Sequence, residues 1–509
     1  METKTAAIEM RNITKRFGPV LANDKVWLNI YRGEILALLG ENGSGKTTLM
    51  NMLSGIYFPD EGEIKIDGKE VVIRSPKDAF DNGIGMIHQH FKLVDVLTAA
   101  ENIVLGLPGK LDLKAASAKI REICDQYGFS VDPAQKIYDM SVSQKQTVEI
   151  VKVLYRGADI LILDEPTAVL TPQETDKLFA VLRNMRNDGK AIVIITHKMH
   201  EVEALSDRVA ILRHGQFIGD MLTAHTNAQE MTNMMVGHAV SLNIERPDPV
   251  DPKPRIEVKG LTVRSVDGIV KLDDVSFTAN SGEILGIAGI SGCGQKELLE
   301  AIAGLQTVES GSISYIEDDG SREELIGKDP LSIAELGVSL SFVPEDRLGM
   351  GLVGNMNLAD NMMLRSFRRG KSIFTDRRSP RALAESVVQE LSVSTPSVDT
   401  PVRRLSGGNV QKVLVGREIA SAPTVLLTAY AVRGLDIHSS YTIYDLINRQ
   451  KKAGVAVIFV GEDLDVLLEL CDRILVLCGG KVSGIVSGRG AEKREVGMMM
   501  TKLGGQSHE

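Results

Sequence analysis

The residues best suited to chemistry lie in the segment GENGSGKT at positions 40–47. It fits the pattern G-x-x-x-x-G-K-[ST], follows an apolar run expected to be a strand and opens a helical pattern. Such glycines let backbone N–H groups surround phosphate oxygens, and the helix N-terminus adds its positive dipole end. We predict that Lys46 reaches the β- and γ-phosphates of a nucleotide and that the Thr47 hydroxyl ligates Mg²⁺. The predicted nucleotide-binding residues of this loop are Gly40, Glu41, Asn42, Gly43, Ser44, Gly45, Lys46, Thr47 and Thr48.

Two carboxylates and a histidine follow apolar runs further along the chain. The run ILILDE (160–165) is expected to deliver Asp164 to the metal and Glu165 to a position where it polarises an attacking water. His197 ends the next apolar run, which favours a place beside the γ-phosphate. In phosphoryl transfer the protein mainly positions groups and neutralises charge. We therefore predict Lys46, Glu165 and His197 as catalytic residues and Asp164 as a metal ligand.

The elements that carry these residues alternate between apolar runs and helical patterns. EILALLG, DILILDE, AIVIITH and RVAILRH are short apolar runs, as expected of strands buried on both faces. PQETDKLFAVLRNMRND, between the second and third of them, has helical periodicity and many charges. This alternation predicts an α/β fold with a largely parallel sheet covered by helices.

The sequence pattern of these elements occurs twice in the chain. RGEILALLGENGSGKTTLMNMLSGI returns 249 positions later as SGEILGIAGISGCGQKELLEAIAGL, and MSVSQKQTVEIVKVL returns 265 positions later as LSGGNVQKVLVGREI. The second copy therefore carries 16 extra residues between these landmarks. We predict a first domain over 5–242, a stiff, solvated, proline-rich linker over 243–254 and a second domain over 255–503.

Composition limits the class of protein. A chain of 509 residues is too long for a single hydrophobic core, so two or more domains are expected. A composition of 43% hydrophobic and 25% charged residues is typical of a soluble globular protein. The net charge of −9 argues against nucleic-acid binding through bulk charge. The four cysteines lack metal-ligand spacing, which favours free thiols in a reducing compartment. The sequence shows no signal-peptide core and no apolar run near the roughly 20 residues of a membrane-spanning helix. A membrane role is therefore expected only through partners.

Four motifs and their order resemble those of an ATP-binding cassette (ABC) ATPase. They are the loop, MIHQHF (86–91), SVSQKQTVEI before LILDEPTAVLT, and ITHK (195–198). Two copies of this pattern together cover nearly the whole chain. The resemblance implies two tandem ABC-type P-loop NTPase domains, each a mostly parallel sheet covered by helices plus a helical subdomain, with ATP and Mg²⁺ bound. It also implies that Gln89 senses Mg²⁺ beside a membrane partner and that Phe17 stacks on adenine. In this family two cassettes close head to tail, so that each ATP lies between one phosphate loop and the opposite signature.

The second copy lacks the residues of the first site, whereas its signature is nearly intact. LSGGN (405–409) stands where the first copy has MSVSQ (140–144), and Asp436 stands where the first copy has Thr171. The resemblance then implies one working site, in which Ser406, Gly407 and Gly408 complete the first loop, and one degenerate site. The substitutions are Lys46 to Gln295, Thr47 to Lys296, Asp164 to Ala429, Glu165 to Tyr430 and His197 to Glu462, with no aromatic residue near Val266, the counterpart of Phe17.

A fused cassette pair without membrane helices resembles the tandem ATPases of bacterial sugar and nucleoside importers. GMIHQHFKLVDVLTAAENIVLG, YRGADILILDEPTAVLTPQE and FVPEDRLGMGLV are most similar to the nucleoside branch. The resemblance implies a peripheral ATPase at the cytoplasmic face of the cell membrane. Its partners would be two permease subunits, docked near Gln89 to Leu97, and an extracytoplasmic solute-binding protein. Alternatives are a ribose- or galactose-type sugar importer, a riboflavin importer, a soluble ABC factor acting on ribosomes or DNA, and a non-hydrolysing scaffold.

Overall fold

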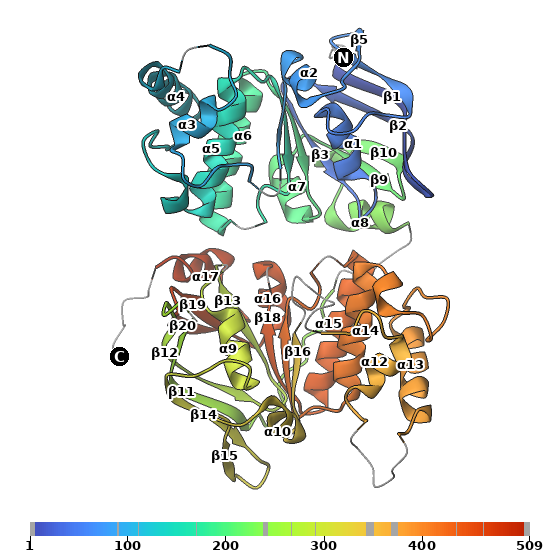
Figure 1. Cartoon of the computed structure of the whole chain (residues 1–509), viewed down its shortest axis with the longest axis vertical. Coiled ribbons are helices and arrows are strands. Elements are labelled where there is room, and N and C mark those ends of the chain that lie inside the picture. Colours follow the sequence, from blue (N-terminus) through green and yellow to red (C-terminus); the bar gives the residue numbers. More distant parts are fainter. Residues whose placement is uncertain are drawn as a thin grey trace. The chain divides into compact units, whose positions relative to one another are not determined.

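The computed structural model describes residues 6–88, 91–109, 111–168, 170–237, 243–265, 267–290, 292–342, 351–367, 375–433, 435–461 and 463–502. The chain divides into two compact units, Met1–Ser241 and Leu242–Glu509, which are called the first unit and the second unit (Figure 1). Within the described ranges, no helix is both long and apolar enough to cross a bilayer.

The first unit contains two sheets. A four-stranded antiparallel sheet has the order β2-β1-β4-β5, and a six-stranded sheet has the order β10-β9-β3-β8-β7-β6, parallel except for its edge strand β10. The strands are β1 (Ala6–Phe17), β2 (Val20–Tyr31), β3 (Glu34–Leu39), β4 (Glu61–Ile66), β5 (Lys69–Val71), β6 (Ile84–Ile87), β7 (Ile160–Asp164), β8 (Ala191–Ile195), β9 (Arg208–Arg213) and β10 (Gln216–Leu222).

The helices of the first unit cover the six-stranded sheet, and α3 and α4 pack with α5 into a helical region at its side (Figure 1). Local sequence begins several of them. Pro172 occupies the first turn of α6, and Thr171 and Glu174 form a capping box there. The helices are α1 (Lys46–Leu53), α2 (Pro76–Asp81), α3 (Ala99–Val104), α4 (Leu113–Tyr127), α5 (Val142–Tyr155), α6 (Pro172–Asn187), α7 (Met199–Leu205) and α8 (Ala228–Val236).

The second unit repeats this topology. Its sheets have the orders β12-β11-β14-β15 and β16-β17-β18-β13-β19-β20, strand for strand the same as in the first unit. The strands are β11 (Pro254–Arg264), β12 (Val270–Asn280), β13 (Ile284–Gly289), β14 (Ser310–Ile316), β15 (Arg322–Glu324), β16 (Val338–Phe342), β17 (Val425–Ala429), β18 (Ala456–Val460), β19 (Arg473–Cys478) and β20 (Lys481–Ser487). The helices are α9 (Gln295–Ile302), α10 (Pro330–Glu335), α12 (Leu358–Met363), α13 (Arg378–Glu390), α14 (Gly407–Ala420), α15 (Ile437–Lys452), α16 (Leu464–Leu470) and α17 (Lys493–Met499).

The predicted mostly parallel sheet with covering helices is confirmed in each unit. Every residue of β3, β7 and β8 is buried, as expected for central parallel strands with both faces covered. The antiparallel sheet was not singled out from the sequence. The pairing of β1 with β2 contains several register shifts. Each shift breaks the alternation of buried and exposed residues, so these strands carry a weaker sequence signal.

The segment 243–254 differs from the solvated linker expected from its prolines. Ile244 is only 8% exposed, and Lys451 donates a hydrogen bond from Nζ to the Pro247 carbonyl. Arg246 donates from Nη1 to two carbonyls at the C-terminal end of α16, at 2.7 Å each. Residues 248 and 250–254 are exposed, as expected of a solvated linker, so the difference is confined to the contacts of 244–247 with the second unit. A proline-rich strand has few N–H donors of its own, but its carbonyls still accept from cations of the second unit.

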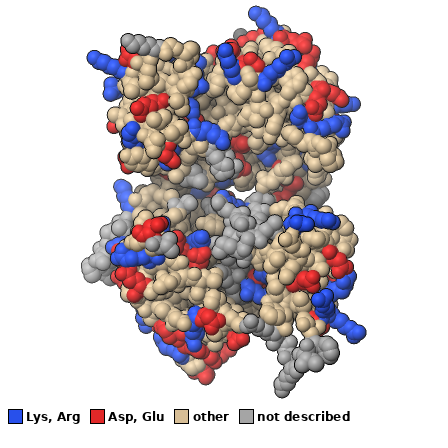
Figure 2. Space-filling view, in the orientation of Figure 1, with Lys and Arg blue, Asp and Glu red and all other residues tan. Residues whose placement is uncertain are grey.

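Charges of both signs are interspersed over the face seen in Figure 2, with an acidic group over the β14–β15 end of the second unit. The acidic residues there are partly neutralised. Arg255 is paired with Asp318, and Lys328 Nζ lies 2.8 Å from Glu323 Oε1. Ion pairs at an exposed surface contribute little to stability. We assign this group to a solvated surface.

Candidate functional site

The predicted phosphate loop connects β3 with α1. Gly45, at the N-terminal end of α1, has φ 94°, the left-handed region that favours glycine. A Cβ atom added there would lie 2.4 Å from the Ala22 carbonyl oxygen. Asn23 donates from Nδ2 to the Gly45 carbonyl at 3.2 Å, which ties the loop to β2. The backbone of this loop therefore requires glycine at this position and is held from a neighbouring strand.

Lys46 is buried within this loop at 7% exposure. Its Nζ donates to the carbonyls of Gly40 at 2.6 Å and Glu41 at 2.9 Å. Burial lowers the pKa of Lys46 to about 8, against the opposing pull of the carboxylates of Glu165 and Asp164. A desolvated ammonium with only carbonyl partners is poised to gain free energy from an anionic phosphate.

Asp164 lies at the end of β7, 9% exposed. The Thr47 hydroxyl donates to its Oδ2 at 3.3 Å. Burial, and next the charge of Glu165, raises the pKa of Asp164 to about 6. In the described part of the chain no group of three or more His, Cys, Asp and Glu could hold a metal. One carboxylate beside one hydroxyl suits Mg²⁺, which takes few protein ligands and completes its shell with phosphates and water.

Glu165 and His197 form a pair beyond the strand ends. Because a carboxylate only accepts, His197 Nδ1 donates to Glu165 Oε1, at 3.0 Å. This hydrogen bond holds the pKa of Glu165 below its usual range, so the carboxylate is ionised at neutral pH. Glu165 has φ 47°, an uncommon conformation for a residue with a side chain.

Phe17 ends β1 with an exposed ring, 41% accessible. Tyr57 supports it edge-on at a centroid distance of 5.1 Å, and Lys15 Nζ lies 5.5 Å from the centroid. A supported and exposed ring is suited to stacking on a base. Its role in adenine binding stays a prediction.

The other predicted loop residues are divided between a buried base and an exposed tip. Ser44 is buried, and its carbonyl accepts from Gly215 N–H at 3.1 Å, whereas Asn42 and Gly43 are exposed. Glu41 and Thr48 are intermediate in exposure. Gln89 lies outside the described residues.

The predicted signature residues lie at the start of α14 in the second unit. Ser406 caps the helix by accepting from Asn409 N–H at 3.4 Å, and Gly407 is the first helical residue. A Cβ atom on Gly408 would make an ordinary van der Waals contact with Leu435, at 3.4 Å. In the first unit the equivalent α5 begins with Val142, whose side chain is exposed.

The second unit retains the backbone of the loop with another side chain inside it. Gly294 has φ 97°, against 94° for Gly45. Gln295 is 4% exposed and donates from Nε2 to the Ile290 carbonyl at 3.1 Å. This hydrogen bond repeats the one from Lys46 to Glu41, since 249 positions separate both pairs of residues. A neutral amide thus fills the place of the ammonium.

The strand end of the second unit shows the same contrast. Ala429, in place of Asp164, is fully buried and packs in the hydrophobic core. Tyr430, in place of Glu165, has φ 54°, so the strained backbone is kept without the carboxylate. Lys296 stands in place of Thr47, and its Nζ lies 3.7 Å from Oε1 of Glu300 on the same helix. The counterparts of His197 and Phe17, Glu462 and Val266, lie outside the described residues.

Two supporting residues escaped the sequence analysis. Asn23 holds the loop from β2, and Tyr57 supports Phe17. Asn23 lies 22 residues before Gly45, and neither it nor Tyr57 belongs to a local motif. Asn23 lies on β2 and Tyr57 in the loop after α1, and only the tertiary structure brings them to the site.

Comparison with known proteins agrees with this geometry. The family profile described as "ABC transporter" matches residues 23–168 and 272–428, more than half of the chain. The nucleoside import ATP-binding protein NupA of Lactococcus lactis is 42% identical, over 99% of each chain. The guanosine import ATP-binding protein NupO of Bacillus subtilis is 40% identical, over 97% of each chain. The ribose import ATP-binding protein RbsA 1 of Rubrobacter xylanophilus is 38% identical, over 96% of this chain and 97% of that protein. The chain therefore belongs to the ABC transporter family, with two ABC ATPase domains in tandem.

Proposed function

We propose that this protein is the ATPase subunit of an importer and that only the first unit carries the catalytic residues for ATP hydrolysis. The observation that carries the proposal is the contrast between two loops of the same backbone. One buries the ammonium of Lys46, and the other buries the amide of Gln295. The second unit also has Ala429 and Tyr430 where the first has two carboxylates.

The chemistry follows from the positions of the first unit's side chains. Glu165, kept ionised by His197, takes a proton from the water that attacks the γ-phosphorus, and the bond to the bridging oxygen of ADP breaks. Lys46 neutralises charge on the phosphate oxygens as it develops. His197 orients Glu165 through the 3.0 Å hydrogen bond.

Thr47 and Asp164 are proposed to hold Mg²⁺, with Gln89 as a further ligand assigned by the family resemblance. When bound, the ion neutralises phosphate charge and orients the nucleotide. The Thr47 hydroxyl and the Asp164 carboxylate already lie 3.3 Å apart, so little rearrangement is needed for both to contact one ion.

The signature residues Ser406, Gly407 and Gly408 are proposed to complete this ATP site. The support is the family resemblance together with the two sequences, LSGGN and MSVSQ. Glycine lets backbone approach phosphate without a side chain in the way, and the first unit has Val142 and Ser143 at those positions. The intact signature and the intact loop therefore belong to opposite units.

Nucleosides are the proposed solute, and riboflavin or a simple sugar such as ribose or glucose is the alternative. Support comes from the names of the relatives, two of which import nucleosides or guanosine, whereas others import ribose or glucose. Deletion of the gene should abolish uptake of labelled nucleosides. Unchanged uptake of every nucleoside tested, with lost uptake of ribose, glucose or riboflavin, would assign the alternative.

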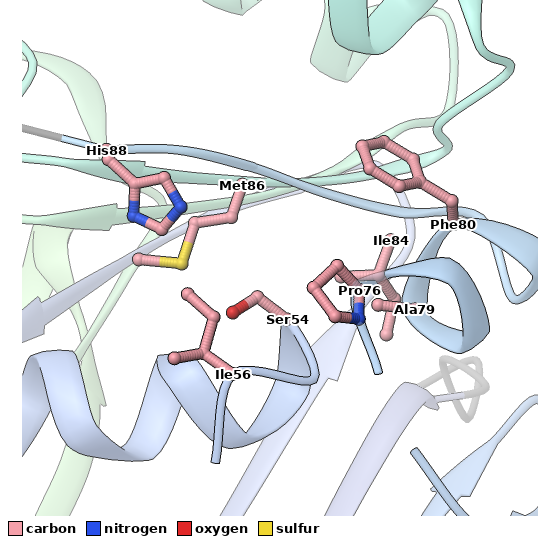
Figure 3. Close-up of a pocket in the computed structure, with 8 residues that line it drawn as sticks. All are labelled: Ser54, Ile56, Pro76, Ala79, Phe80, Ile84, Met86 and His88. Atoms are coloured by element: carbon pink, nitrogen blue, oxygen red, sulfur yellow. The ribbon is translucent and has the colours of Figure 1, made fainter. Parts of the chain in front are cut away.

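A pocket in the first unit supports docking on a permease subunit at the cytoplasmic face of the membrane, with a solute-binding protein on the other side. The pocket is a small hollow of about 70 Å³ that is open to solvent. In Figure 3, Met86 extends toward Ile56, and His88 and Phe80 lie at opposite ends. Burial, and next the charge of Lys92, lowers the pKa of His88, so the ring is neutral. The chain runs from His88 into 89–97, the predicted docking segment, so an apolar side chain of the permease fits here.

The second unit provides a natural variant of this pocket. Ile333 of α10 stands where α2 has Ala79, and it is 1% exposed. Ala79→Ile should therefore fill the pocket, leave the ATPase rate of the isolated protein unchanged and weaken co-purification with the permease. Undiminished co-purification would place the docking surface elsewhere.

The test of the catalytic assignment is Glu165→Gln in the purified chain, with Tyr430→Phe as the matched control. Glu165→Gln should bind ATP and lower turnover by about 10²-fold or more, because amide nitrogen and oxygen cannot take the proton. Tyr430→Phe should stay within a few-fold of the original rate. Unchanged turnover in Glu165→Gln would refute the proposed role.

A further inference from the structure

A buried carboxylate lies behind the reacting residues of the first unit. Glu201, in the first turn of α7, is 3% exposed. It accepts from the Thr167 hydroxyl at 2.5 Å and from the Thr196 hydroxyl at 3.3 Å, and Lys198 Nζ lies 3.2 Å from its Oε1. A buried carboxylate is stable only when it is hydrogen-bonded and paired. These four residues, the Glu201 cluster, form one satisfied group.

The cluster joins the two segments that carry the catalytic pair. Thr167 follows Glu165 by two residues, and Thr196 directly precedes His197. The Lys198 N–H also donates to the Thr196 hydroxyl at 3.1 Å. Hydrogen bonds from the segment of Glu165 and from the segment of His197 therefore converge on one carboxylate.

The second unit shows that the fold does not require this cluster. The backbone hydrogen bond from Glu165 N–H to the Ile195 carbonyl, 2.9 Å, recurs from Tyr430 to Val460 at 2.9 Å. Yet the four positions of the cluster, 265 residues later, hold Val432, Gly461, Asp463 and Val466. Both valines pack against the hydrophobic core. The polar cluster thus occurs only in the unit that has the catalytic pair.

We propose that Glu201 is a positioning residue for ATP hydrolysis, which holds Thr167 and Thr196 so that Glu165 and His197 keep their hydrogen bond. Glu201 touches neither the nucleotide nor the attacking water. Lys46 and Phe17 lie on other segments, so loss of the cluster should lower kcat and leave nucleotide binding unchanged. This inference rests on the proposed roles of Glu165 and His197.

The experiment uses the full purified chain and measures kcat and KM for ATP. Thr167→Val keeps the shape, removes the hydroxyl and introduces the residue of the second unit. It should lower kcat about tenfold or more, since small displacements of catalytic groups are costly, with KM nearly unchanged. Thr167→Ser restores the hydroxyl and should return most of the rate. Glu201→Gln should act like Thr167→Val, and it replaces that variant if Thr167→Val does not fold.

Val466→Ala is the matched control, because Val466 is the counterpart of Glu201 in the second unit and packs against the hydrophobic core. This variant should leave kcat unchanged. An unchanged kcat in Thr167→Val and Glu201→Gln, with Glu165→Gln inactive, would overturn the inference and leave the proposed function intact. A loss in Thr167→Val that Thr167→Ser does not rescue, or an equal loss in Val466→Ala, would show a general effect on folding and would also overturn it. Full turnover in Glu165→Gln would instead refute the proposed function.

Discussion

The two phosphate loops differ in charge, whereas their backbones agree at the glycine that precedes the helix. Gly45 and Gly294 have φ 94° and 97°, and Lys46 and Gln295 make the same hydrogen bond to the carbonyl five residues earlier. The second loop thus keeps the shape of a phosphate-binding loop after losing its cation. The comparison separates what folding requires from what hydrolysis requires.

The largest effect on the ATPase rate is expected when the ammonium of Lys46 is removed. Lys46→Ala should lower ATPase turnover by about 10²–10³-fold, because a buried charge that stabilises the transition state contributes several kcal/mol. Gln295→Ala removes no charge and should change the rate only a few-fold. Steady-state rates of both variants test this, and equal inactivation by the two would abolish the distinction between the loops.

The next effect concerns the two signatures. Gly407→Asp should be nearly as damaging as Lys46→Ala, since it places an anion beside the γ-phosphate of the proposed site. Val142→Asp, in the first unit's MSVSQ, should be mild. An acidic residue in the first turn stabilises a helix, so neither change should unfold α14 or α5. ATPase rates together with circular dichroism check both points, and an inactive Val142→Asp would contradict the proposed assignment of signatures.

A smaller effect should appear in stability. Burial raises the pKa of Asp164 to about 6, whereas an ordinary Asp is near 4. The folded state therefore binds this proton more tightly than the unfolded state, so stability falls as pH rises from about 4 to about 6. Above that range the ionised carboxylate costs on the order of 3 kcal/mol.

Asp164→Asn removes this cost and should raise the thermal midpoint of the nucleotide-free protein at pH 8, less so at pH 5.5. The second unit already has the uncharged Ala429 at this position. Thermal melts across pH measure the difference. A midpoint gain that grows toward acidic pH would show that the sign is wrong.

The smallest effect is expected at Phe17. Stacking of a base on an aromatic ring is worth about 1–3 kcal/mol, so Phe17→Ala should weaken ATP binding about tenfold with little change in kcat. Trp27→Ala is the matched control, since this ring is also half-exposed on the antiparallel sheet of the first unit. Calorimetric titration with ATP compares the two, and equal affinities would remove Phe17 from the site.

Local motifs were sufficient for much of the fold and of the candidate site. The central strands and α6 lie where apolar runs and helical periodicity predict them, because buried parallel strands and amphipathic helices have short-range signals. The antiparallel sheet was missed, since its register shifts blur the alternation. The contacts of 244–247 with the second unit have no local signal, because their partners lie about 200 residues away.

Within the candidate site, Lys46, Thr47, Asp164, Glu165 and His197 are predicted from motif and spacing, because each lies at or within two residues of a strand end or a helix start. Their contrast with Gln295, Ala429 and Tyr430 also follows from the repeat in the chain. The tertiary structure alone decided the burial that lowers the pKa of Lys46, the ring that supports Phe17 and the convergence of Thr167, Thr196 and Lys198 on Glu201. The physical reason is that desolvation and convergent hydrogen bonds depend on segments that are distant in sequence and become neighbours only when the sheet forms.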